Sequence, residues 1–106
     1  MFSDCISLKS ICIQNFNTQN VIYMNSMFEK CESIEEINIL NFDTINIKNM
    51  NYMFHNCISL KKIDISNFNF ENVDAEYMFS NCTKELKMKI KTQNVNINEE
   101  AFKDFL

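Results

Sequence analysis

Cysteine is the residue type in this sequence that could take part in the widest range of chemistry. Four of the five cysteines recur at regular intervals. They are Cys5, Cys31, Cys57 and Cys82, and their spacing is almost constant. Zinc ligands usually come in pairs only a few residues apart, and the single histidine is the only residue that could add a nitrogen ligand. We therefore expect no metal site.

The same cysteines could instead form a disulfide ladder or a column of buried thiols. If one interval corresponds to one turn of a repeating structure, neighbouring cysteines would lie close enough to be bridged. Free cysteine, however, commonly behaves as a small buried hydrophobic residue. Phe105 also stands where the next cysteine of the series would fall, and phenylalanine can replace only a packing role. We favour buried thiols, with the disulfide ladder as the alternative.

Cys12 and His55 are the two other candidates for reactivity. Cys12 lies between Ile11 and Ile13, so in an extended segment its thiol would point away from the apolar face and be accessible. A cysteine nucleophile needs a base held beside it, and His55 precedes Cys57 with one residue between them. Serine or glutamate stands at the equivalent positions of the other intervals. We therefore expect His55 at the surface, no catalytic residue and no enzyme.

The regular spacing belongs to an internal repeat that extends over the whole chain. Met-Phe pairs begin at positions 1, 27, 53 and 78. Thr92–Val95 has the same sequence as Thr18–Val21. These two segments are separated by fewer residues than Met1 and Met78 are, so the last unit is shortened internally. We predict a single repeat domain over 1–106, with a degenerate, capping last unit. Its units are 1–26, 27–52, 53–77 and 78–106.

Each unit combines an extended pattern with a helical one. In Leu60–Ser66 the β-branched residues Ile63 and Ile65 alternate with a polar residue, as in a short strand. In Asn46–Cys57 the apolar residues follow spacings of 3, 3, 1 and 3, which predicts a short helix with Asn46 as its N-cap. Equivalent N-caps would be Asn20, Asn72 and Asn94. Stacked units predict an α/β leucine-rich-repeat-like solenoid, with short parallel strands on one face and short helices on the other.

Two aromatic columns and one asparagine column recur with the units. The aromatic columns could provide stacking platforms for a sugar or a base, but their Met and Ile neighbours favour a core role. The asparagines should bond to the backbone in the loop after each strand. The three columns are Phe2/Phe28/Phe54/Phe79, Phe16/Phe42/Phe68 and Asn15/Asn41/Asn67.

A ligand would contact side chains that differ between units. Outward strand positions should place Glu35 beside Lys61 and Glu36 beside Lys62 on neighbouring strands, and the last unit should form a basic end. Such pairs could also serve only to hold the stack together, which is the alternative. The candidate ligand face consists of Lys9, Cys12, Glu35, Glu36, Asn38, Lys61, Lys62, Asp64, Lys87, Lys89 and Lys91.

Composition and charge exclude several classes of partner. The net charge of −4 argues against nucleic acid, and no apolar run is long enough to span a membrane. No motif indicates a cofactor, and no signal peptide is visible, so the sequence itself gives no location. The chain contains neither glycine nor proline, so Asn, Asp, Ser and Thr must form its turns.

The complete pattern of one unit resembles a known repeat. MFHNCISLKKIDISNFNFENV, Met53–Val73, is similar to the BspA-type leucine-rich repeat of bacterial surface proteins, in which the unit has the same length as here. The last unit departs from this pattern, because Glu85 stands at the leucine position. The resemblance implies a non-catalytic protein–protein interaction module at the cell surface or secreted. Its partner would be a protein ligand, such as a host or extracellular-matrix protein.

Two other functions remain as alternatives. One is a structural spacer within a longer repeat protein, and the other is a Cys-dependent enzyme. The segment Met1–Cys5 corresponds to those that end the predicted helix in later units. We therefore expect either a fragment of a longer array or self-association through an open N-terminal end.

Overall fold

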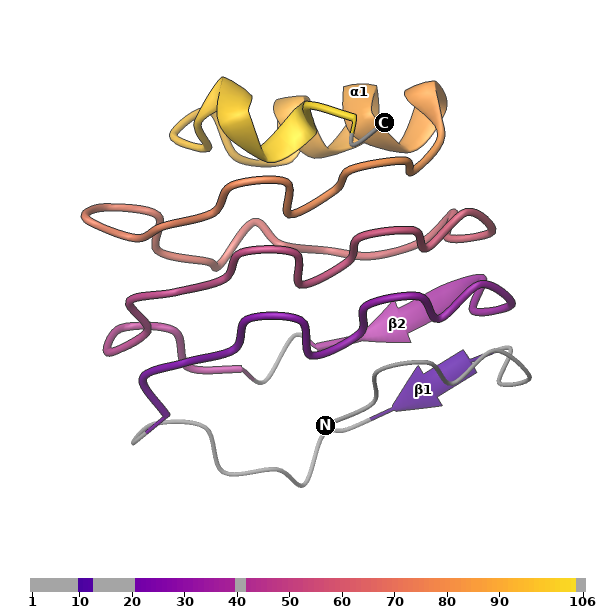
Figure 1. The fold of residues 1–106 in the computed structure, drawn as a ribbon. Helices are drawn as coiled ribbons and strands as arrows, with labels where there is room; N and C mark the ends of the chain where they lie inside the picture. Colours follow the sequence, from indigo (N-terminus) through magenta and orange to yellow (C-terminus); the bar gives the residue numbers. More distant parts are fainter. Residues whose placement is uncertain (1–9, 13–20, 40–41, 105–106) are drawn as a thin grey trace.

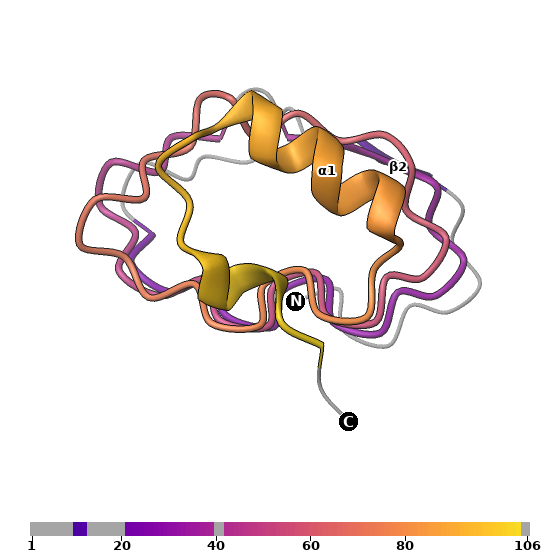
Figure 2. The same ribbon diagram turned by 90° about the horizontal axis from the view of Figure 1, so that it is seen from above.

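The computed structural model describes residues 10–12, 21–39 and 42–104. The chain runs in successive coils that lie one above another (Figure 1) and nearly superpose when seen from above (Figure 2). The elements are β1 (Ser10–Cys12), β2 (Glu36–Asn38), the α-helix α1 (Lys84–Gln93) and the 3-10 helix η1 (Glu99–Phe102). Both helices lie at the end of the stack opposite β1 (Figure 1).

One repeat unit corresponds to one coil. Strand β1 pairs with β2 in parallel, with Ile11 opposite Ile37, so the two partners are separated by the same interval as Met1 and Met27. A parallel bridge from Glu36 to Lys62 continues the pairing into the next coil. In that coil Leu60–Ser66 contributes this bridge and does not form a named strand.

Turns and a β-bridge at Asn49 replace the helix that we predicted over Asn46–Cys57. Tyr52 and Asn56 have φ angles of 59° and 63°, which interrupt a right-handed helix. The N–H of Tyr52 donates to the carbonyl of Glu76, at 3.1 Å, and that of Phe54 to Met78, at 2.8 Å. The apolar spacing therefore marked a buried face correctly, but the helix prediction was wrong because the next coil accepts these hydrogen bonds.

The predicted N-caps Asn46 and Asn72 were wrong for the same reason, whereas Asn20 lies outside the described residues. Asn46 lies in a turn, and Asn72 has a φ of 58°. Left-handed residues recur in two columns, Ser26/Tyr52/Tyr77 and Lys30/Asn56/Asn81. Asparagine tolerates this conformation better than most residues, which suits a chain without glycine.

The last unit forms α1 where we predicted a strand. The N–H of Leu86 donates to the Thr83 hydroxyl at 3.2 Å, and Glu85 and Lys91 lie in the first and last turns, where they complement the helix dipole. The helix buries Leu86 and Ile90 but leaves Met88, which the repeat places in a core column, 66% exposed. Lys, Glu, Leu and Met favour helix, so local preference overrides the repeat here.

Buried columns run through the coils, as predicted for the described residues. Phe28, Phe54, Phe79 and Phe102 stack with ring centroids 5.4, 5.1 and 5.9 Å apart. Phe42 and Phe68 are also buried. Cys31, Cys57 and Cys82 are buried free thiols, so the disulfide alternative does not apply to them. Each fully buried phenylalanine contributes about 1.5–3 kcal/mol relative to an exposed one.

Side chains of Gln93 and Asn94 cover the edge of the third coil. Gln93 donates to the carbonyl of Ile63 and accepts from the N–H of Ile65, both at 2.9 Å. The amide of Asn94 donates to the carbonyls of Phe68, at 2.9 Å, and Ile65, at 3.3 Å. Asn94 therefore ends α1 and is not the N-cap that we predicted; Asn98 is the N-cap of η1.

Some of the predictions concern residues outside the described ranges. They include those for Met1–Cys5, Lys9, the asparagines Asn15 and Asn41, and Phe105. Among the residues that are described, no helix has the length and apolar character needed to cross a membrane.

Candidate functional site

The predicted ligand face is partly assembled on the strand side of the coils. Glu36 and Asn38 of β2, Lys62 and Asp64 of the next coil, and Gln93 line a groove of about 340 Å³. The repeat brings the residues of the two coils together, because strand positions one interval apart become neighbours, and Gln93 is added from the end of α1. The groove therefore joins side chains from three units.

Two ion pairs lie along this face, as predicted. Lys61 Nζ lies 3.9 Å from Glu35 Oε1, and Lys62 Nζ lies 3.8 Å from Glu36 Oε1. All four side chains are more than half exposed, so water screens each pair and its net contribution is small. These charges can therefore exchange their present partners for those of a ligand at low cost.

Asp64 adds a fixed negative charge to the groove. Its Oδ1 accepts hydrogen bonds from the hydroxyl of Ser66, at 2.6 Å, and from the N–H of Ser66, at 2.9 Å. These bonds lower the pKa of Asp64 because they stabilise the carboxylate, and the bond from the hydroxyl has the larger effect. The groove thus presents both signs of charge at neutral pH.

The predicted basic end does not extend this face. Lys87, Lys89 and Lys91 belong to α1 instead of a strand. Lys87 pairs with Asp104, and Lys91 Nζ lies 3.4 Å from Glu99 Oε2. Of the remaining candidates, Lys9 and the side chain of Cys12 are not among the described parts of the structure.

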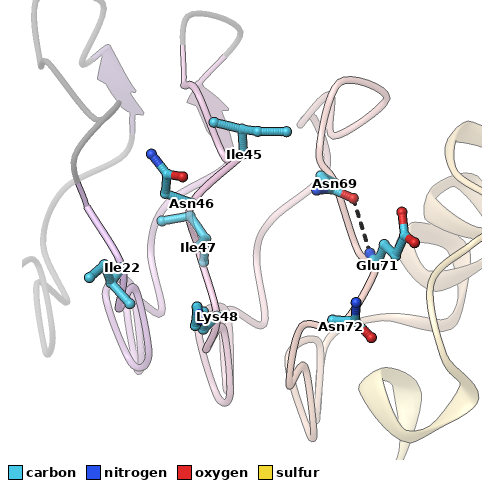
Figure 3. Close-up of a pocket in the computed structure, with 8 residues that line it drawn as sticks. All are labelled: Ile22, Ile45, Asn46, Ile47, Lys48, Asn69, Glu71 and Asn72. Atoms are coloured by element: carbon cyan, nitrogen blue, oxygen red, sulfur yellow. Dashed lines mark hydrogen bonds between the residues drawn. The ribbon is translucent and has the colours of Figure 1, made fainter.

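Sequence reasoning missed a second groove, which lies at the loops that follow the strands (Figure 3). It has a volume of about 570 Å³, and Ile22 and Ile45, 43% and 65% exposed, contribute to its apolar part. A signal was present, since Ile22 follows Val21, and two adjacent apolar residues in extended chain face opposite sides. Its lining residues are Ile22, Ile45, Asn46, Ile47, Lys48, Asn69, Glu71 and Asn72.

The buried thiols are poorly suited to nucleophilic chemistry. Cys57 Sγ donates to the carbonyl of Phe28 at 3.1 Å, and Cys82 Sγ to that of Phe54 at 3.2 Å. Burial raises the pKa of Cys57 far above its usual range and that of Cys82 to about 12. Since the thiolate is the reactive form, both groups are held in their unreactive state.

His55 is buried, which contradicts the surface position that we predicted. It is 8% exposed, and its ring packs edge-on against Tyr52 at 5.6 Å between centroids. The next coil has a buried serine, Ser80, at the equivalent position, so this column faces inward. Burial lowers the pKa of His55, with Glu29 raising it and Lys30 lowering it to smaller extents.

No group of three His, Cys, Asp or Glu side chains within the described ranges could hold a metal ion. The chain matches the model of a protein family. The model of a family described as "Mycoplasma protein of unknown function, DUF285" matches residues 1–105. The comparisons with curated proteins and with solved structures give no match.

Proposed function

The chain belongs to the DUF285 family, and from this premise we propose that it is a non-catalytic module that binds another protein. In this proposal its coils are units of a BspA-type leucine-rich-repeat-like solenoid. The sequence resemblance supports that assignment, and so does the parallel pairing of segments one repeat interval apart. The protein ligand would contact the strand side of the coils.

The groove between Glu36 and Lys62 is the observation that carries this proposal. The buried columns keep the same residue types from coil to coil, whereas the groove residues differ in charge from one coil to the next. Side chains that vary on a constant framework are the usual source of specificity in stacked repeats. A shallow, mixed-charge surface also suits a protein better than a small molecule, which prefers a concave apolar pocket.

Adhesion at a cell surface is the role that we propose for this binding. It rests on the resemblance to bacterial surface-protein repeats, whose members adhere to host and matrix proteins. A ligand of this kind would bring its own charged side chains to the groove. Complementary charges would then determine which partner binds and how fast it associates, and would affect the total affinity less.

A charge exchange at one ion pair tests the proposal. The double variant Glu36→Lys with Lys62→Glu keeps an internal ion pair but reverses the charge pattern that a ligand meets. Immobilised extracellular-matrix proteins provide the probes, and binding is read by surface plasmon resonance. We expect the exchange to weaken binding of a matrix protein by about tenfold.

Glu32→Lys is the matched control, because Glu32 is exposed and lies outside the groove. It should leave binding within about twofold of the native value. Failure of every matrix protein to bind would favour the structural spacer over an adhesive module. Equal weakening by both variants would show that the strand side is not the contact surface.

A further inference from the structure

One face of α1 has a composition that the repeat does not explain. Lys84, Lys87, Met88 and Lys91 follow spacings of 3, 1 and 3, so they share a face of the helix. This face differs from the core face, which carries Leu86 and Ile90. The helix contains four lysines and one glutamate in a chain whose net charge is −4. Positive charge is therefore concentrated on α1, whereas the neighbouring η1 carries Glu99 and Glu100.

This lysine face forms one wall of a groove at the end of the stack. η1 and the two residues after it form the other wall, and the groove has a volume of about 530 Å³. Ligand sites commonly have volumes of about 300–1,000 Å³. Met88 supplies exposed apolar surface, and Lys91 Nζ lies 4.9 Å from the ring centroid of Phe102. The groove thus has an apolar centre between the lysines of α1 on one side and Glu99, Lys103 and Asp104 on the other.

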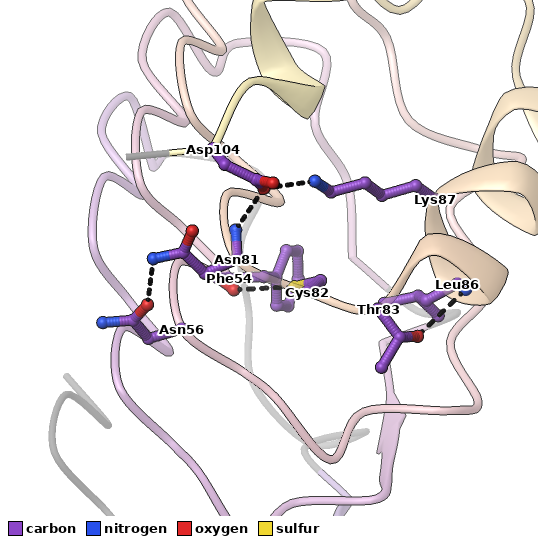
Figure 4. Close-up of polar contacts among 8 residues, drawn as sticks. All are labelled: Phe54, Asn56, Asn81, Cys82, Thr83, Leu86, Lys87 and Asp104. Atoms are coloured by element: carbon purple, nitrogen blue, oxygen red, sulfur yellow. Dashed lines mark hydrogen bonds and ion pairs between the residues drawn. The ribbon is translucent and has the colours of Figure 1, made fainter. Parts of the chain in front are cut away.

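Fixed contacts hold the two walls together. Lys87 donates to Asp104, and Asp104 also accepts from the N–H of Asn81 at 2.9 Å (Figure 4). The Asn81 side chain donates to Asn56 Oδ1 at 2.7 Å, which links the wall to the coil below. Both Lys87 and the N–H of Asn81 lower the pKa of Asp104, so it remains ionised. These contacts hold the backbone of the two walls in place before a ligand binds.

The lysines differ in how accessible they are. The side chain of Lys87 is only 13% exposed, so its role is to hold the wall. Those of Lys91 and Lys103 are 46% and 58% exposed, and Lys84 is also exposed. In the described part of the chain no ion pair involves Lys84. Lys84 and Lys91 therefore flank Met88 with accessible ammonium groups, and Lys91 would exchange its exposed partner Glu99 for a carboxylate of the ligand.

We propose that the groove between α1 and η1 binds an acidic peptide segment of a partner protein. Carboxylates of the segment would pair with Lys84 and Lys91, while one apolar side chain would pack on Met88. A nucleic acid fits less well, because its many phosphates would be repelled by the negative charge of the chain as a whole. The inference rests on the proposed role as a protein-binding module but uses a different surface.

The test measures binding of a fluorescent Glu-Glu-Leu-Glu-Glu peptide by anisotropy at low salt. A Lys-Lys-Leu-Lys-Lys peptide serves as the opposite-charge control. We expect saturable binding of the acidic peptide alone, weakened at least about tenfold in the double variant Lys84→Glu with Met88→Glu. Both residues are exposed, so the variant should retain the native circular dichroism and thermal midpoint.

Lys61→Glu, on the strand side, is the matched charge reversal and should leave peptide binding unchanged. Equal weakening by this variant, or no saturable binding to the native chain, would overturn the proposal. Tighter binding of an oligonucleotide than of the peptide would also overturn it. So would self-association of the native chain that Lys84→Glu with Met88→Glu abolishes, because the occupant would then be a second copy.

The two proposals can fail separately. The exchange of Glu36 and Lys62 should weaken binding to a matrix protein without changing binding of the acidic peptide. The double variant Lys84→Glu with Met88→Glu should weaken binding of the acidic peptide without changing binding to a matrix protein.

Discussion

The middle coils and the C-terminal cap, residues 83–104, are joined to their neighbours by partly different groups. Between coils many of the bonds are between backbones: the N–H groups of Phe28 and Phe54 donate to the carbonyls of Met53 and Met78 at 2.9 and 2.8 Å. Such bonds continue into the cap, where Ala101 accepts from the N–H of Phe79 at 2.8 Å, but the cap also uses side chains. In the cap, the side chains of Gln93 and Asn94 accept or donate at positions that another coil would otherwise occupy.

This difference explains where the sequence can vary. Backbone bonds are available to nearly every residue type, so the coils require only that their buried columns are kept. The exposed positions between those columns are then free to differ, which is where the strand groove lies. The cap depends, in addition, on particular amide and charged side chains. A single substitution there should loosen the end of the stack while the coils remain folded.

Removal of one ring from the aromatic column should have the largest effect. Phe54 is fully buried between Phe28 and Phe79, so Phe54→Ala leaves a cavity in the middle coils. We expect a loss of about 3–5 kcal/mol in the free energy of unfolding, measured by urea denaturation. Ile58→Ala, at a position 51% exposed, is the control and should cost much less. Equal losses would mean that the column does not dominate stability.

Loss of the Asn94 amide should have the next largest effect. Asn94→Ala leaves the carbonyls of Ile65 and Phe68 without these donors, at a cost of about 1–3 kcal/mol. Hydrogen exchange should rise first in α1 and in the coil beneath it. Asn96→Ala, at an exposed position, is the control. Uniform acceleration of exchange in all coils would contradict a separately stabilised cap.

The middle coils were more predictable from the sequence than the cap. The repeat interval determines which residues become neighbours, so it identified the Phe54 and Cys57 columns and the pairing of Glu35 with Lys61. Periodicity did not reveal which groups accept the hydrogen bonds of each coil. For that reason the turns over Asn46–Cys57 were interpreted as a helix.

The cap shows a second limit of sequence patterns. Leu86, Met88 and Ile90 alternate with lysines as in a strand, yet Leu86 and Ile90 also fit one face of a helix. The choice between them depends on Thr83 as the N-cap and on the surface of the coil beneath. The groove beside Met88 follows from that choice, so the sequence alone could not place it.

Acid should destabilise the middle coils through His55. Burial lowers its pKa from the ordinary 6.5, so the fold favours the neutral ring. The stability due to the neutral ring is complete above about pH 6.5 and is lost as the pH falls toward the lower folded-state pKa. Urea denaturation between about pH 7 and 5 measures the loss.

His55→Ser is the control, since Ser80 occupies the equivalent buried position in the next coil. This variant should lose the pH dependence between those limits while it retains the fold. An unchanged slope in His55→Ser would assign the acid sensitivity to groups other than His55.

The exposed ion pairs of the middle coils should contribute least to the stability of the fold. A double-mutant cycle of Glu35→Ala and Lys61→Ala should give a coupling of about 0–1 kcal/mol, because both side chains are at least half exposed. About 1 M salt should abolish it, since screening then acts within about 3 Å. The matched cycle of Lys87→Ala and Asp104→Ala should give a larger coupling, because Lys87 is only 13% exposed. A stronger coupling at Glu35 and Lys61 would reverse the comparison, since side-chain charges would then join the coils more firmly than they join the cap.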